Sequence, residues 1–180
     1  MEANEAHELQ EHAEQGAESG MRPVAFTMSV LAVLVAVTTV LGHRTHTEAV
    51  LDQNKATDQW NEYQAKKIRS YNTSLESDLL GVVNLNDKDK AAKLAKSYAD
   101  HQAKWTEDLK EGQEKAEGLE ALVEKAKARA ARFDLGEALL EIGLVVTSVT
   151  LLTRSRIYWY FGMAFAAAGV LSALAAFLVR

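Results

Sequence analysis

The sequence predicts an all-α integral membrane protein with three transmembrane helices and a long antiparallel coiled-coil hairpin between the first and second. Three separate stretches are apolar and long enough to cross a bilayer. A single proline and ten glycines in 180 residues leave few helix breakers, and strand-like alternation is absent. The polar segment between the first two apolar stretches is rich in Ala, Glu, Lys, Gln and Leu, which are good helix formers.

The chain begins with an acidic segment, residues 1–22, whose few apolar residues predict a mobile tail. The first predicted transmembrane helix follows at 23–42, and no charge occurs within 24–41. At a rise of ~1.5 Å per residue, such a stretch covers the ~30 Å hydrocarbon core of a bilayer. Because the preceding flank is acidic rather than basic, we do not interpret this span as a cleaved signal peptide.

Residues 43–134 predict an antiparallel helical hairpin with a turn near 84–90, where Asn and Asp residues cluster. In its second half, apolar and small residues recur at spacings of three and four, which is a coiled-coil repeat. This predicted seam comprises Ala95, Tyr98, Gln102, Trp105, Leu109, Gly112, Ala116, Leu119, Val123, Ala126, Ala130 and Phe133. The first half is looser but also one-faced, with Trp60, Tyr63, Ile68, Tyr71, Leu75, Leu79 and Val82.

A turn near residue 88 also predicts which residues meet across the hairpin, because the numbers of paired residues should add up to about 176. Two continuous helices of about sixty residues, roughly 90 Å long each, would satisfy this register. Trp60 is then expected over Ala116, with Gly112 close by, and Tyr71 is expected to meet Trp105. Leu75 and Leu79 are expected to flank Tyr98. The predicted hairpin contacts are therefore Trp60, Tyr71, Tyr98, Trp105, Gly112 and Ala116.

The second predicted transmembrane helix covers 135–153, a short basic loop follows at 154–156, and the third helix covers 157–180. Small residues form a stripe along the first span and another along the third, which lets helix backbones approach closely in lipid. We expect one stripe to pack inside the chain and the other to be free for a second subunit or another partner. The alternative is that the stripes occur by chance, because the spans are rich in alanine. The stripes are Ala25, Ser29, Ala32 and Ala36, continued by Thr39, and Gly162, Ala166, Gly169, Ala173 and Ala176.

Charged and polar residues gather where the hairpin joins the spans. This predicted collar comprises His43, Arg44, His46, Arg132, Glu137 and Glu141. The register sets Glu137 beside Thr39 and His43, where an ion pair or hydrogen bond would offset part of its desolvation cost. Two histidines opposite two glutamates are also a possible set of ligands for a divalent metal. A helical Glu-x-x-His motif is missing, however, so we predict no metal site and no cofactor.

Glu141 is about one turn deeper in its span, opposite Val35, which offers it no partner. Carboxylates inside membrane segments usually face protein or water and often mark ion or proton paths. Three alternatives stay open from the sequence: Glu141 is protonated, its side chain reaches back to the interface, or it meets another subunit.

The distribution of arginines predicts a cytoplasmic N-terminus with the hairpin on the outer side of the membrane. Arg22, Arg154 and Arg156 flank the short loop side, where the positive-inside rule is most informative. The opposite orientation is favoured by the acidic tail and by the arginines on the hairpin side, which are Arg44, Arg129, Arg132 and Arg180.

Two stretches are similar to a bacterial family defined as a domain of unknown function. They are GHRTHTEAVLDQNKATDQWNEYQAKKIRS after the first span, in which DQW-x-x-YQAK (58–66) is the most specific part, and LLTRSRIYWYFG between the last two spans. The resemblance covers nearly the whole chain and implies a multi-pass protein of the bacterial cytoplasmic membrane. It implies no activity and no functional residues.

No feature of the sequence favours catalysis, so we predict no catalytic residues. A nucleophile with an adjacent base and a Gly-rich phosphate loop are both missing, and the lysine-rich runs are balanced by nearby acids, which argues against nucleic-acid binding. The expected function is that of a non-catalytic structural or accessory membrane subunit. Its expected contact elements are Trp60, Trp105 and the small-residue stripe of the third span. Its expected partners are the lipid bilayer and either copies of itself or the subunits of a larger membrane complex. The alternatives are an ion- or proton-conducting oligomer that uses Glu141 and, third, a metal-binding collar.

Overall fold

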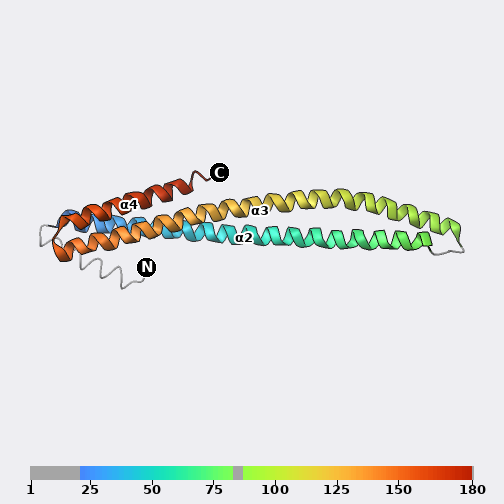
Figure 1. The fold of residues 1–180 in the computed structure, drawn as a ribbon, viewed down its shortest axis with the longest axis horizontal. Coiled ribbons are helices and arrows are strands. Elements are labelled where there is room, and N and C mark those ends of the chain that lie inside the picture. The colour runs from blue at the N-terminus through green and yellow to red at the C-terminus, as the bar shows by residue number, and fades with distance from the viewer. Residues whose placement is uncertain (1–20, 83–86, 180) are drawn as a thin grey trace. The chain divides into compact units, whose positions relative to one another are not determined.

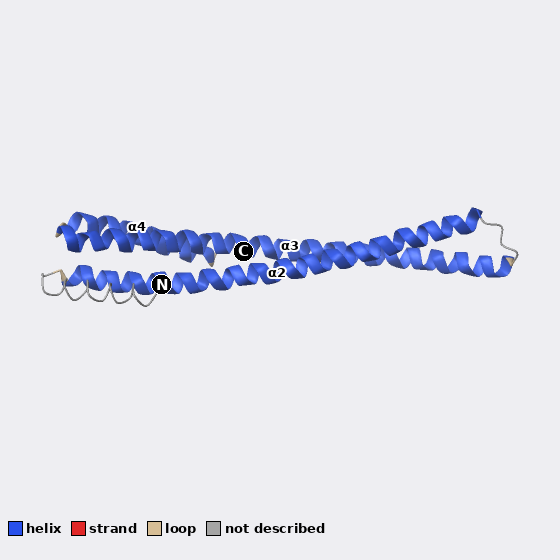
Figure 2. Ribbon diagram, turned by 90° about the horizontal axis from the view of Figure 1, so that it is seen from below, coloured by secondary structure: helices blue, strands red, loops and turns tan. Residues whose placement is uncertain are grey.

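The computed structural model describes residues 21–82 and 87–179, which contain three helices: α2 (Arg22–Val82), α3 (Lys88–Thr153) and α4 (Arg156–Ala176) (Figure 1). Every regular element in this described part is helical, and none is a strand (Figure 2). The predicted all-α fold is therefore confirmed. The acidic tail predicted for 1–22 falls on residues outside the described part except for its last two, and 84–86 of the predicted turn region lie outside it as well.

Local sequence explains where α3 begins and ends. Asp87 precedes the helix, and its carboxylate accepts a hydrogen bond from the backbone N–H of Lys90 at 3.1 Å, as an N-cap residue does. After Thr153, Arg154 takes a left-handed conformation (φ 54°), which commonly ends a helix, and the extended Ser155 precedes α4. The basic loop is thus one residue shorter than predicted, because Arg156 already begins α4.

All three helices contain a segment that is long and apolar enough to cross a membrane. In α4 this segment is almost the whole helix, whose 21 residues correspond to ~30 Å. Large apolar side chains such as Val33, Phe165 and Leu171 are exposed on the outer surface of these segments. A helix that is apolar on its outer as well as its inner face is typical of a membrane span.

The chain forms two compact units. We call the first the three-helix unit; its described residues are 21–49 of α2, 124–153 of α3, and α4 with its flanking residues up to 179. We call the second the hairpin unit; its described residues are 50–82 of α2 and 87–123 of α3.

The three-helix unit has a dense apolar core. Leu31 and Val35 of α2, Leu140 of α3 and Ala166 of α4 form its central cluster. Close to one end, the ring of Phe133 is fully buried and packs edge-to-face on Phe177, with 5.6 Å between the ring centroids. All three helices therefore contribute to a single core.

Glycines bring α3 and α4 into backbone contact, and Figure 1 shows α4 lying beside α3. A Cβ atom placed on Gly162 would lie 2.8 Å from the carbonyl oxygen of Gly143, and one placed on Gly169 would lie 2.8 Å from the carbonyl oxygen of Gly136. Neither helix leaves room for a side chain at these positions. The small-residue stripe of α4 is therefore used inside the chain, against α3, and the expectation that it would contact a partner is wrong for these buried positions.

The hairpin unit has a thin seam made of small and polar residues. Ala56 and Gln59 of α2 and Ala116 and Val123 of α3 are buried. Gly112 is buried beside them: a Cβ on it would make ordinary contacts, at 3.9 Å, with the side chains of Gln59 and Tyr63. On α3, the predicted seam residues are buried or half-buried from Tyr98 to Phe133, whereas Ala95 is exposed.

The apolar residues in the later part of α2 differ from the prediction, because they face away from the seam. Ile68, Tyr71, Leu75, Leu79 and Val82 are 54–85% exposed. The physical reason is a step of five residues between Tyr63 and Ile68, which rotates the apolar row by roughly 140° around the helix at ~100° per residue. The seam continues instead through half-buried Ser70, Thr73, Ser77 and Leu80. We call the five exposed residues the outer row.

Candidate functional site

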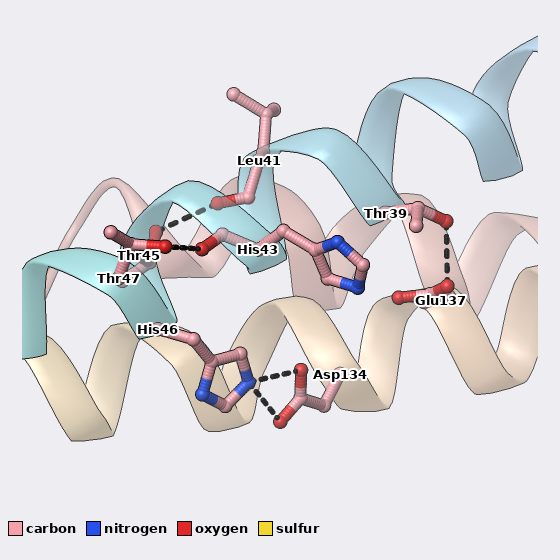
Figure 3. Close-up of polar contacts among 8 residues, drawn as sticks. All are labelled: Thr39, Leu41, His43, Thr45, His46, Thr47, Asp134 and Glu137. Atoms are coloured by element: carbon pink, nitrogen blue, oxygen red, sulfur yellow. Dashed lines mark hydrogen bonds and ion pairs between the residues drawn. The ribbon is translucent and has the colours of Figure 1, made fainter. Parts of the chain in front are cut away.

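Glu137 of the predicted collar makes its contact with a threonine (Figure 3). The hydroxyl of Thr39 donates a hydrogen bond to Oε1 of Glu137 at 2.6 Å, and the same hydroxyl lies 3.0 Å from the carbonyl oxygen of Val35 in its own helix. The numbers of Thr39 and Glu137 add up to the predicted 176. In the part of the chain that the structure describes, the ring of His43 makes no hydrogen bond to Glu137, and its side chain is exposed.

The second contact of the collar joins His46 to Asp134, a residue that the sequence reasoning missed. Nε2 of His46 lies 2.9 Å and 3.0 Å from the two carboxylate oxygens of Asp134 (Figure 3). Arg129 and Glu48 form a third, longer ion pair at 3.6 Å. The pairing rule was the signal that could have found these pairs, because His46 and Glu48 fall within a turn of Asp134 and Arg129 in that register.

The remaining collar residues have other surroundings. Arg44 and Arg132 are exposed, and it is the backbone carbonyl of Arg132 that accepts a hydrogen bond, from the hydroxyl of Ser172 at 2.9 Å. Within residues 21–82 and 87–179, no three His, Cys, Asp or Glu side chains gather in a way that could hold a metal ion. The geometry of the collar suits a structural clamp between α2 and α3, in which polar pairs fix the register of the two helices.

Glu141 lies on the outer surface of the three-helix unit. Its side chain is exposed, and its neighbours Ala138, Ile142, Val145 and Val146 form a shallow, nearly apolar hollow on α3 with it. Within the described residues, no hydrogen bond or ion pair reaches its carboxylate. A carboxylate on the outer face of an apolar helix is costly unless another group meets it.

The small-residue stripe of α2 is only partly used inside the chain. Ala25 is buried and Ala32 is half-buried, but Ser29 and Ala36 are exposed. Because Thr39 meets Glu137 in an antiparallel pair, Ala36 lies level with Glu141. Of the two exposed stripe residues, Ala36 therefore occurs at the depth of the exposed carboxylate, and Ser29 is about two turns away along α2.

The predicted hairpin contacts are distributed around the seam. The indole N–H of Trp60 donates a hydrogen bond to Glu120 at 2.8 Å, and its ring packs edge-to-face on Tyr63 at 5.5 Å between centroids. Ala116 is fully buried. Trp105 and Tyr98 are half-buried, whereas Tyr71 lies in the exposed outer row, with the ammonium group of Lys67 6.0 Å from its ring centroid.

Two places in the hairpin unit perturb ionisable groups. A hydrogen bond and ion pair between Glu62 and Lys66, 2.7 Å apart, lower the pKa of Glu62 and raise that of Lys66 from their ordinary values. Partial burial, together with the carboxylate of Glu76, raises the pKa of Tyr98. None of these groups lies near a cavity, so they stabilise helices rather than mark a reactive centre.

These features define the described part of the chain as all-α, with three helix segments that are long and apolar enough to cross a membrane. The profile of the family described as a domain of unknown function, DUF4337, matches residues 20–179. The chain therefore belongs to this family. The comparisons with curated proteins and with solved structures gave no match.

Proposed function

We infer that this protein is a non-catalytic structural membrane subunit, which assembles through its hairpin and its spans with copies of itself or with a larger membrane complex. The observation that carries this proposal is the outer row, whose five apolar side chains are 54–85% exposed along one face of the hairpin unit. In this proposal α2, α3 and α4 each cross the bacterial cytoplasmic membrane once. The hairpin unit lies in water, on the outer side.

The spacing of the outer row suits a helical partner. Ile68, Tyr71, Leu75 and Val82 follow each other at three, four and seven residues, as the a and d positions of a heptad do. Leu79 completes the stripe one helical turn after Leu75. Fully burying one such side chain contributes about 1.5–3 kcal/mol relative to leaving it in water. The row is therefore a strong docking element for the coiled-coil face of another subunit.

The membrane part supports the same function through Glu141 and the exposed small residues of α2. Ser29 and Ala36 would let a further helix approach α2 closely. A donor or cation on that helix would meet the carboxylate of Glu141, which lies level with Ala36. The proposed subunit thus has one contact surface in water and one in the membrane.

The first test is the mass of the particle extracted from native membranes in mild detergent, with every co-purifying chain identified. We expect a particle larger than one chain. The double variant Leu75→Glu with Leu79→Glu should shift it to a smaller mass, because two charges then occupy the outer row. The matched control, His101→Glu with Ala103→Glu, adds the same charge at exposed positions of α3 and should leave the mass unchanged.

A monomeric wild-type particle without other chains would overturn the proposal. An unchanged mass of the Leu75→Glu, Leu79→Glu variant would exclude the outer row as the interface. A larger particle made only of this chain identifies a homo-oligomer, and stoichiometric foreign subunits identify an accessory role.

A second candidate function is an ion- or proton-conducting oligomer, favoured by the exposed position of Glu141 on a membrane-length helix segment. Several copies would then line a path with this carboxylate. Purified protein in liposomes should give a pH-dependent conductance that Glu141→Gln removes. Absence of current at every pH would exclude this candidate, while a mass change in Glu141→Gln without any current would assign the residue to assembly.

A further inference from the structure

An open groove of about 520 Å³ runs between α2 and α4 on the three-helix unit. Its walls are Phe26, Val30 and Leu34 of α2 and Met163, Ala167 and Leu171 of α4, with Thr27 as its polar member. Its size is within the roughly 300–1,000 Å³ typical of ligand sites. A groove with such walls suits a hydrocarbon chain.

One end of the groove adjoins a group of arginines. Arg22 is one turn before Phe26 on α2, and Arg156 is two turns before Met163 on α4. Arg154 is in the two-residue loop directly before α4. The indole N–H of Trp159 donates a hydrogen bond to the hydroxyl of Thr27 at 3.3 Å, which joins α2 and α4 between the arginines and the groove.

All three arginines are exposed, and within the described residues no carboxylate forms an ion pair with any of them. Arginine binds phosphate through two parallel hydrogen bonds, and basic groups at the ends of membrane helices bind anionic headgroups. The hydrocarbon groove and the cationic end therefore match the two parts of one molecule.

We propose that this groove is a binding site for an anionic phospholipid, with an acyl chain between α2 and α4 and the phosphate at Arg22, Arg154 and Arg156. The inference rests on the proposed function in one respect, because it requires the three-helix unit to lie in a membrane. It goes beyond that function by naming a ligand and the residues that hold it. The charge complementarity of the arginine end favours phospholipid over a further helix.

The three tryptophans of the chain allow a site-specific test. With Trp60→Phe and Trp105→Phe, the remaining Trp159 is located at the arginine end of the groove. The protein is reconstituted in vesicles that contain phosphatidylglycerol or phosphatidylcholine with brominated acyl chains, which quench nearby indoles. We expect phosphatidylglycerol to bind beside Trp159 several-fold more strongly, with roughly a fivefold loss of this preference for each arginine replaced by glutamine.

The controls separate headgroup from chain. Arg44→Gln, at the collar end of α2, should keep the preference. Ala167→Phe fills the groove. In this variant, phosphatidylglycerol should quench Trp159 no more than phosphatidylcholine does. Ala168→Phe adds the same ring at an exposed neighbour outside the groove and should leave the stronger quenching by phosphatidylglycerol unchanged.

Equal quenching by the two lipids would overturn the proposal. A preference for phosphatidylglycerol that survives in the double variant Arg154→Gln, Arg156→Gln and also in the variant Ala167→Phe would overturn it as well. If the wild-type particle is larger than one chain and shows no preference for phosphatidylglycerol, a second copy of the chain is the occupant of the groove. That result would also overturn the proposal. Extraction of the protein from membranes by alkaline carbonate would instead show failure of the proposed membrane insertion. The two failures are thereby distinguished.

Discussion

The three-helix unit and the hairpin unit use the same kind of helix in opposite ways. In the three-helix unit, glycines place α3 against α4 so closely that the backbones touch, and large side chains such as Phe133 and Leu140 fill the core. In the hairpin unit, the buried positions are small or polar, and the large apolar residues of the outer row are exposed. The three-helix unit therefore buries large side chains in a core of its own, whereas the hairpin unit leaves large apolar side chains exposed.

The difference shows that a row of large apolar residues on a helix does not by itself identify the face that packs within the chain. Between two helices, a seam of Ala56, Gln59 and Ala116 is sufficient to bring them together. The larger side chains are then available for other contacts. We therefore expect substitutions to affect the folding of the three-helix unit strongly and that of the hairpin unit weakly.

The largest effect is expected from Gly162→Ala. The added Cβ would lie 2.8 Å from the carbonyl oxygen of Gly143 and 3.1 Å from the backbone nitrogen of Thr147, so the helices must separate. Such overpacking costs about 1–3 kcal/mol. Unfolding by a denaturing detergent, followed through Trp159 in the Trp60→Phe, Trp105→Phe background, should show this loss in the free energy of unfolding.

Gly118→Ala is the matched control in the hairpin unit. Nothing lies within 4 Å of a Cβ at this position, so only helix propensity acts, and it should stabilise the helix by up to about 1 kcal/mol. Trp60 and Trp105 fluorescence in the Trp159→Phe background measures it. Opposite signs for the two glycines support the comparison, and equal effects would contradict it.

The second effect concerns the collar clamp. Thr39→Val keeps the side-chain shape but removes the hydroxyl that donates to Glu137 at 2.6 Å, so a half-buried carboxylate loses its partner. Hydrogen bonds to charged groups contribute about 1.5–3 kcal/mol. The loss should be visible in the Trp159 signal of the three-helix unit.

Thr45→Val provides the reference for this change, because the Thr45 hydroxyl donates only within its own helix, to the carbonyl oxygen of Leu41 at 2.9 Å. It should cost much less than Thr39→Val. In a Glu137→Gln background, the two threonine variants should differ less than in wild type. A constant difference in both backgrounds would show that the Glu137 contact contributes nothing.

The third effect is a gain. The hydroxyl of Thr150 is fully buried and has no hydrogen-bond partner among the residues that the structure describes. That of Thr147, equally buried, donates to the carbonyl oxygen of Gly143 at 2.7 Å. An unsatisfied buried hydroxyl costs about 1 kcal/mol or more. Thr150→Val should therefore stabilise the three-helix unit by about that amount. Thr147→Val should not, and a gain in both would point to general hydrophobicity instead.

The positions that the sequence predicted well are those where a single periodicity dominates. The seam of α3 from Tyr98 to Phe133 kept its predicted face, and the pairing rule set Thr39 beside Glu137. In both cases, a regular spacing was enough information. The α4 stripe was recognised as a packing surface, but it packs inside the chain against α3 and not against a partner as expected.

The exposed outer row could not be derived in the same way. After Tyr63, α2 has an apolar face and a polar face that could each form the seam. Apolar spacing favoured Ile68 and Tyr71, although the register of Gln59 and Tyr63 places polar residues inside. Asp134 could have been found with the pairing rule, which sets it within a turn of His46, but spacing along α3 alone does not indicate it. Sequence periodicity gives the number of faces on a helix, but the partner helix decides which of them is buried.

The smallest effect sharpens the comparison from the side of the hairpin unit. The pKa of Glu62 is lowered by its hydrogen bond to Lys66 and by the charge of that residue, so its contribution to stability is present above the ordinary value of 4.5 and is lost as the pH falls through the lowered pKa. The pKa of Lys66 is raised, chiefly by its hydrogen bond to Glu62, so its contribution is present below 10.5 and is lost as the pH rises through the raised pKa. The pair should therefore stabilise the hairpin unit on a plateau between these limits.

Glu62→Gln tests this plateau. It should lower the unfolding midpoint slightly at a pH on the plateau and leave it nearly unchanged at a pH below the plateau. The measurement is Trp60 and Trp105 fluorescence in the Trp159→Phe background. Both residues also interact across the hairpin, Glu62 with Lys115 and Lys66 with Asp108 and Glu111. Lys66→Met loses two such interactions and Glu62→Gln loses one, so Lys66→Met should cost slightly more. If neither variant lowers the midpoint on the plateau, these charges do not help to hold the thin seam together.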